Sequence, residues 1–155
     1  MPRFEVVTLI QAPVEVVFDT SLSVETHTSS MRASRERAVA GVTSGQLTLG
    51  DQVTWQARHF GISWRLTSTI SACTRPSFFV DEQVAGPFRR WHHAHHFQAS
   101  TDGTVMRDVV DFAAPYGLLG VFADLLVLRR HMTRLIILRN QHIKAVTEAS
   151  AQNAG

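Results

Sequence analysis

Hydrophobic and polar residues alternate along the middle of the chain, which is the pattern of half-buried β-strands. Glycine, proline and Asp-Gly interrupt the alternation, and these residues favour turns. The pattern predicts strands at residues 4–10, 34–40, 52–60, 63–72, 78–84, 91–99 and 104–112. The Asp102-Gly103 pair between the last two predicts a hairpin turn centred on it.

Helical spacing marks the two ends of the chain. It predicts short helices at residues 14–20 and 21–31, with Ser23 as the N-cap of the second. After Pro115 the apolar residues recur every three or four positions, which predicts one helix of about 30 residues. Its apolar positions are Leu118, Val121, Phe122, Leu125, Leu128, Met132, Leu135, Ile136 and Ile143. Basic residues are expected on the remaining surface: Arg129, Arg130, Arg134, Arg139 and Lys144.

This order of elements predicts an α+β fold in one domain, which is normal for 155 residues. We expect a curved antiparallel sheet of six or seven strands around the long C-terminal helix, with two short N-terminal helices. The domain spans residues 1–148, and the small, polar tail at 149–155 is expected to fray. A strongly curved sheet does not close tightly on a straight helix, so a cavity is expected between them.

Composition narrows the class of protein. Hydrophobic residues make up 45% and charged residues 18%, as in a folded soluble protein, and the net charge is only +2. Positive charge is too sparse for a nucleic-acid groove, and no segment predicts a signal peptide or a membrane span. The single cysteine, Cys73, fits a reducing cytoplasm. The basic stretch at 129–134 is expected on the solvent-exposed face of an amphipathic helix. A transient contact with a membrane surface is the alternative that remains for it.

Four of the eight histidines lie within residues 92–96. Side chains alternate between the faces of a strand, so Trp91, His93, His95 and Phe97 share one face. The aromatic members predict that this face is buried and that His92 and His96 are exposed to solvent. Two inward imidazoles need polar partners, because burying a polar group without one is costly.

Neighbouring strands supply further inward residues. On 52–60, Trp55 and His59 fall on the apolar face, and on 104–112 so do Met106, Asp108 and Phe112. Counting from the expected turn places Val110 roughly opposite His95 and Asp108 opposite Phe97, within a residue or two. Asp108 is therefore expected to reach His95. Glu36 is expected to be a solvated carboxylate.

Short motifs along the whole chain resemble the helix-grip superfamily of START-like (SRPBCC) and polyketide-cyclase/dehydrase-like proteins. The chain is most similar to the bacterial branch that is loosely labelled as related to a cell-division inhibitor. The motifs are QAP (11–13), VFD (17–19), HTSS (27–30), Glu36, AGVTSG (40–45), GDQVTW (50–55), RHFG (58–61), GPF (86–88), HAHHF (93–97), GTVMRD (103–108), Pro115 and RN (139–140).

The resemblance implies a deep pocket between sheet and C-terminal helix that holds an apolar or amphipathic ligand. It also implies that Phe79, Asp81 and Gln83 face this pocket. Hydrophobicity alone favours the opposite face of residues 78–84, which carries Phe78, Val80, Glu82 and Val84. The cell-division label would suggest a regulatory partner protein, but no residue of the chain supports one.

Three interpretations of the inward histidines remain. They and Asp108 satisfy one another's hydrogen bonds, or they hold the polar end of a ligand, or they perform acid–base catalysis, or they bind a metal together with His59 and Asp108. We favour binding of a lipid-like or polyketide-like molecule, without metal or cofactor. Trp55, Trp91, Phe97, Met106 and Phe112 would then line the apolar part, and His59, Asp81, His93, His95 and Asp108 the polar end. The rival is a cyclase or dehydratase in which His93, His95 and Asp108 are the catalytic candidates. The oligomeric state stays open.

Overall fold

Seven antiparallel strands form one sheet in the computed structural model, which describes residues 3–114 and 121–155 and only the backbone of 121–124. The strand order across the sheet is β1-β7-β6-β5-β4-β3-β2. Every predicted strand is present, with ends shifted by three residues at most. The strands are β1 (Arg3–Ile10), β2 (Arg37–Gly41), β3 (Gln52–His59), β4 (Ile62–Thr74), β5 (Phe78–Ala85), β6 (Arg90–Ser100) and β7 (Gly103–Ala113).

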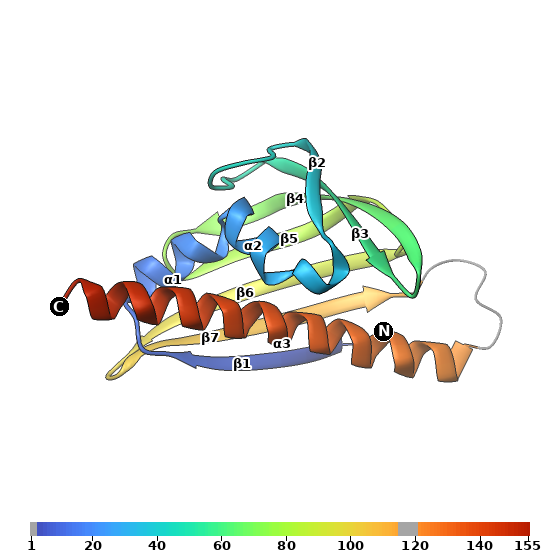
Figure 1. Cartoon of the computed structure of the whole chain (residues 1–155). Helices are drawn as coiled ribbons and strands as arrows, with labels where there is room; N and C mark the ends of the chain where they lie inside the picture. The colour runs from blue at the N-terminus through green and yellow to red at the C-terminus, as the bar shows by residue number, and fades with distance from the viewer. Residues whose placement is uncertain (1–2, 115–120) are drawn as a thin grey trace.

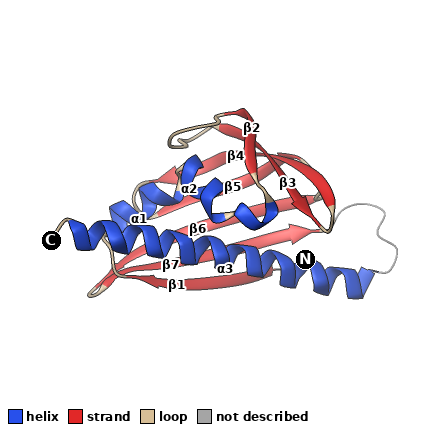
Figure 2. Ribbon diagram, viewed as in Figure 1, coloured by secondary structure: helices blue, strands red, loops and turns tan. Residues whose placement is uncertain are grey.

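The helices lie on one face of this sheet (Figures 1 and 2). Helices α1 (Val14–Ser21) and α2 (Val24–Ser30) follow β1 and are joined to β2 by the short 3-10 helix η1 (Arg32–Ser34). Ser23 caps α2 as predicted, because its Oγ accepts a hydrogen bond of 3.2 Å from the Thr26 N–H. The long α3 (Val121–Asn153) runs across the sheet. This confirms the expected α+β arrangement.

Bulges bend the sheet around the helices. The pairing register shifts once between β2 and β3, at Ala38/Ala40, and twice between β4 and β5, near Ser68 and between Ile70 and Ala72. An extra residue on one strand kinks that strand and increases its twist. The bulged part of the sheet therefore curls over the helical face, which leaves room beneath it for a cavity.

The hairpin that joins β6 to β7 turns one residue earlier than expected. Ser100 pairs with Gly103, so the turn is centred on Thr101-Asp102, and the opposing pairs become His95–Asp108 and Phe97–Met106. Gly103 is therefore the first residue of β7, and the chain that follows β1 passes close to it. A Cβ atom on Gly103 would lie 2.2 Å from the carbonyl oxygen of Ile10, and its φ is +142°.

Helix α3 presents polar as well as apolar side chains to the sheet. Met132, Ile136 and Ile143 are buried as predicted, but Arg139 and Asn140 are buried with them. The prediction that Arg139 lies on the surface is wrong, because it fills the gap in the apolar pattern between Ile136 and Ile143. Leu118 lies outside the described residues, as do the side chains of 121–124. The helix continues to Asn153, so most of the tail expected to fray is helical.

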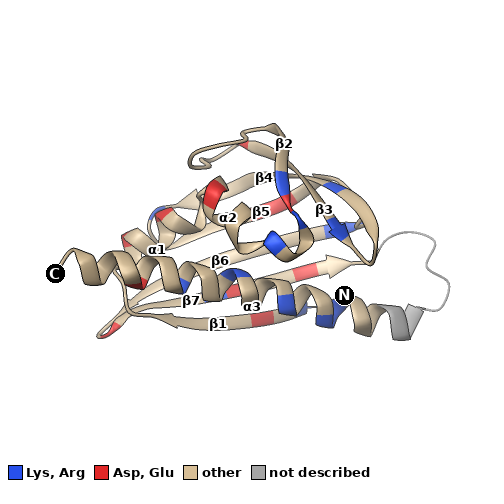
Figure 3. Ribbon diagram, viewed as in Figure 1, with Lys and Arg blue, Asp and Glu red and all other residues tan. Residues whose placement is uncertain are grey.

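Charged residues of both signs are spread over the molecule (Figure 3). Arg129, Arg130 and Arg134 are exposed on the first half of α3, as predicted. No helix among the described residues is long and apolar enough to cross a membrane.

Replacing Gly103 with alanine tests the close crossing of β1 and β7. We expect a loss of about 1–3 kcal/mol from the positive φ and a further ~1–3 kcal/mol from the forced contact with Ile10. The matched control is Gly61→Ala, which has a positive φ of 73° but no atom within 4 Å of the added methyl group. Urea unfolding measures both variants, and equal losses would contradict the contact.

Candidate functional site

A cavity of about 200 Å³ lies between the inner face of the sheet and α3. Leu22 and Met31 from the N-terminal segment, Ile70 from β4, and Met132 and Ile136 from α3 contribute to its apolar wall. All three tryptophans of the chain, Trp55, Trp64 and Trp91, also line it. A cavity larger than the roughly 150 Å³ that accepts benzene can hold a small organic molecule.

A buried carboxylate, Asp108 on β7, organises the polar side of this cavity. It is inaccessible to solvent and lies behind the histidines rather than in the cavity wall. Its Oδ1 is 2.7 Å from His93 Nε2, and its Oδ2 accepts a hydrogen bond of 2.6 Å from Asn140 Nδ2. Burial opposes ionisation, but the close contacts with His93 and His95 outweigh it and hold the pKa of Asp108 well below its usual value. Asp108 is therefore an anion within the core.

His95 is held as a neutral imidazole. Its ring stacks between Phe79, at a centroid distance of 4.0 Å, and His93, at 3.7 Å. Burial, followed by the neighbouring charge of His93, lowers the pKa of His95 well below its usual value despite the nearby Asp108. His95 Nδ1 is 3.0 Å from Asp108 Oδ1, but the angle is too poor for a hydrogen bond, and Nε2 also lacks a partner among the described residues. A neutral ring thus borders the cavity with unused hydrogen-bonding capacity.

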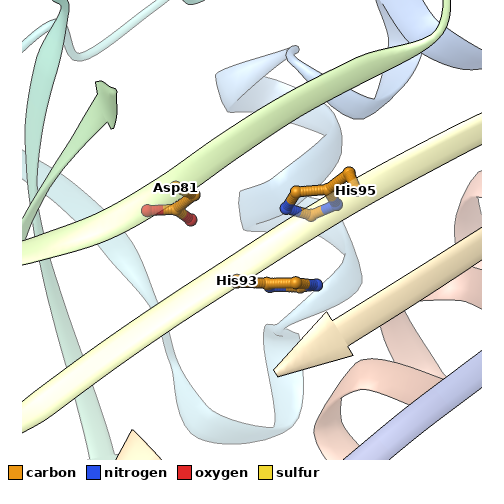
Figure 4. Close-up of side chains that lie close together, drawn as sticks. All are labelled: Asp81, His93 and His95. Carbon is orange, nitrogen blue, oxygen red and sulfur yellow. The ribbon is translucent and has the colours of Figure 1, made fainter. Parts of the chain in front are cut away.

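Asp81 on β5 completes the polar end of the cavity. It pairs across the strands with His93, and its side chain lies near His93 and His95 (Figure 4). One ligand-capable atom from each of the three residues lies within 4.8 Å of the other two. Asp81 Oδ1 is buried and has no hydrogen-bond partner in the part of the chain that the structure describes. Phe79 and Asp81 line the cavity, as the resemblance implied and against the choice that hydrophobicity alone favours. Gln83 does not line it, and its side chain is hydrogen-bonded to the backbone of Phe88.

Buried Arg139 and Asn140 join α3 to the polar cluster, and sequence reasoning missed both as site residues. The Arg139 guanidinium donates to Asn140 Oδ1 at 3.1 Å and to the Ser21 carbonyl at 3.3 Å, and it lies 3.7 Å from Asp108 Oδ1. Burial lowers the pKa of Arg139, while the charges of Asp108 and Asp81 oppose that shift. An Arg-Asn pair at a core position of the helical pattern was the signal that could have found them.

The structure separates several residues that were predicted to lie together. His93, His95, Asp81, Trp55 and Trp91 line the cavity as expected. Phe97, Met106 and Phe112 are instead sealed in the core and do not reach the cavity wall. Helix α1 covers the first two: the Phe18 ring packs on Phe97 at 5.3 Å, and Ser21 lies against Met106. Phe112 packs in a second apolar cluster with Phe4, Val110, Met132 and Ile136.

His59 lines the cavity but belongs to a different polar group from His93 and His95. Its Nδ1 lies 3.0 Å from Nε2 of His131 on α3, which fits one neutral donor and one neutral acceptor. Burial lowers the pKa of both rings. His131 is therefore half-buried against the end of β3 rather than exposed like the arginines at 129–134 of α3.

Glu36 is not the solvated carboxylate that was expected. His27 Nε2 lies 2.6 Å from Glu36 Oε1, both residues line the cavity, and the Glu36 side chain is only 12% exposed. The His27 ring also lies against Trp55, at a centroid distance of 4.2 Å. The cavity therefore has a second polar wall at its β2–β3 side.

The outward histidines are less exposed than expected. His92 is half-buried beside Glu82, and the His96 ring packs on Phe78 at a centroid distance of 5.0 Å. Phe78 in turn packs against a small apolar cluster of Val80, Ala94 and Val109. Neither lines the cavity.

Solved structures share this architecture over nearly the whole chain. A protein of Thermus thermophilus is 16% identical, with a TM-score of 0.74 over 94% of this chain and 99% of its own. The Zhui aromatase/cyclase of Streptomyces sp. R1128 is 12% identical, with a TM-score of 0.74 over 99% and 98%. Major latex-like protein 151 of Panax ginseng is 13% identical, with a TM-score of 0.66 over 94% and 97%.

The chain has the helix-grip fold. The resemblance seen in the sequence is thereby confirmed for the fold, and identities of this size carry no function from one protein to another. No family model matches the sequence. No curated protein matches it either.

The neutral state of His95 predicts a pH dependence of stability. The unfolded chain takes up a proton on this imidazole near pH 6.5, whereas the folded protein does so only at much lower pH, so acidification favours unfolding. The free energy of unfolding should therefore fall between pH 7 and pH 5. In a His95→Phe variant this fall should be smaller by about 2 kcal/mol, because each pH unit is worth about 1.36 kcal/mol for one titrating group.

Urea unfolding at a series of pH values measures this slope. The control Phe79→Leu alters the same stack without removing a titrating group and should keep the wild-type slope. An unchanged slope in the His95 variant would show that His95 is not held neutral.

Proposed function

We propose that the protein binds a compact amphipathic molecule in the cavity between the sheet and α3. The observation that carries the proposal is the combination of an apolar cavity with polar atoms at one end, on Asp81 and His95, that have no partner among the described residues. Binding sites for small molecules combine these features, with apolar walls and a few polar groups that fix orientation. A buried polar atom without a partner is costly, so a ligand that supplies the missing hydrogen bonds gains affinity.

The size and polarity of the cavity describe the ligand. About 200 Å³ is below the common range of roughly 300–1,000 Å³ for drug-sized ligands, which supports a molecule of one or two rings, or one end of a longer chain. Asp81 Oδ1 accepts hydrogen bonds, and neutral His95 both donates and accepts. A hydroxyl group at the end of the ligand suits this pair.

The place of action is part of the proposal. Cys73, the single cysteine, is a half-buried free thiol whose pKa is raised by burial. A free thiol of this kind supports a reducing compartment such as the cytoplasm.

Binding is tested with 1-aminoanthracene, whose fluorescence rises in an apolar site. Wild type should bind one equivalent and change the emission of the cavity tryptophans. Ser68→Leu should weaken binding at least tenfold, because Ser68 lines the cavity and the larger side chain fills it. The matched control Ala99→Leu, at an exposed position of β6, should bind like wild type.

Native mass spectrometry of untagged protein from cells should also show an added small-molecule mass. Wild-type protein that carries no such mass and binds no probe would overturn the proposal.

A cyclase or dehydratase is the second candidate, and the Asp108–His93 hydrogen bond is the observation that favours it. A buried carboxylate that orients a histidine beside a cavity is a common arrangement for general acid–base catalysis. The likeness in fold to an aromatase/cyclase also supports this candidate.

The catalytic candidate is tested by incubation with an aryl 1,5-diketone that can undergo intramolecular aldol condensation. Product formation should fall at least a hundredfold in His93→Gln if His93 is the base. Wild-type protein that binds the diketone without converting it would leave binding as the only activity.

A further inference from the structure

We propose that Asp81, His93 and His95 form a binding site for one divalent transition-metal ion, such as Zn²⁺, at the polar end of the cavity. The sequence alone pointed to a pocket without metal, and its only candidate ligands besides the paired histidines were His59 and Asp108. The structure replaces these two with Asp81, which lies opposite His93 on the neighbouring strand.

The donor atoms are close enough to share an ion. Each residue offers one atom within 4.8 Å of the other two, and all three side chains come from the adjacent strands β5 and β6 (Figure 4). Metal–ligand bonds of about 2.0–2.1 Å put neighbouring ligands about 3.4 Å apart in a tetrahedral site. The ligands thus need to close by an ångström or so, which side-chain rotation supplies.

The hydrogen bonds of the described residues leave ligand atoms of all three residues free to bind a metal. Asp81 Oδ1 and both nitrogens of the fully buried His95 have no hydrogen-bond partner among the described residues. His93 spends Nε2 on Asp108, and no hydrogen bond of the described residues reaches its Nδ1. A single ion would satisfy one atom on each of the three residues.

The surroundings of His93 have the form of a second shell around a metal. A metal-binding histidine commonly gives its other ring nitrogen to a carboxylate, which orients the ring and increases its basicity. Asp108 does this for His93 and is itself fixed by Asn140 Nδ2 at 2.6 Å.

Charge does not oppose the ion. Asp81 and Asp108 supply two carboxylates, whereas Arg139 is the cation held beside them, 3.7 Å from Asp108. With both imidazoles neutral, as ligation requires, the site has one negative charge in excess before the ion enters. Two nitrogens and one carboxylate oxygen suit Zn²⁺ or Fe²⁺ better than Ca²⁺ or Mg²⁺, which prefer oxygen ligands only. Three protein ligands also leave one position free for an oxygen atom of a molecule in the cavity.

Cobalt is the probe for this site, because its visible absorption reports the ligands. Untagged, metal-free wild type should bind one equivalent of Co²⁺ with a new visible spectrum, and Zn²⁺ should displace it. Asp81→Asn and His95→Gln should each weaken binding at least tenfold. Asp108→Asn should weaken it by about 10- to 100-fold through the second shell.

Glu82→Gln and His96→Gln are matched controls on the opposite face of the same two strands, and both should bind Co²⁺ like wild type. Circular dichroism checks that every variant is folded. Absence of a cobalt spectrum in wild type, or an equal spectrum in folded Asp81→Asn and His95→Gln, would overturn the metal site. Binding of 1-aminoanthracene to metal-free protein is measured in parallel, so that the ligand cavity and the metal site stand or fall separately.

Discussion

The buried carboxylate of Asp108 is the group on which the interior of this protein depends. An ion in the core is tolerated only when hydrogen bonds and opposite charges replace the water that it loses. Here they come from two elements: His93 on β6, and Asn140 and Arg139 on α3. The same contacts therefore fix the position of the long helix over the sheet and the orientation of a cavity histidine. One charged group, Asp108, therefore serves both the packing of the fold and the candidate site.

Much of this fold is readable from the sequence, because alternation and helical spacing report burial directly. The strands, the capped second helix and the inward direction of His93 and His95 follow from such patterns. The details that fail depend on contacts between distant segments. Gly103 lies in β7, where the chain after Ile10 passes close to it, and Phe97 is kept from the cavity by Phe18, which packs on it. No local pattern encodes either contact.

The candidate site shows the same division. The alternation of side chains along the strands predicts that Asp108 shares a face with His93 and His95. It does not predict that Asp108 lies behind the two imidazole rings while Asp81 lies beside them. Arg139 was assigned to the surface because charged residues are rarely buried without partners. Its partners come from β7, from Asn140 and from the end of α1, so the exception is visible only in three dimensions.

The position of β1 at one edge of the sheet has a consequence for how the protein is made. β1 is synthesised before the other six strands of the sheet, yet its only partner among the described strands is β7: Phe4 pairs with Val110, and Ile10 with Thr104. Pairings so distant in sequence make folding slow, because a long loop must close before any contact stabilises it. On the ribosome, β1 must wait until β7 has emerged. During that interval Phe4 and Ile10, which are buried in the folded protein, stay open to solvent and to chaperones, so the edge of the sheet that supports α3 is completed late in folding.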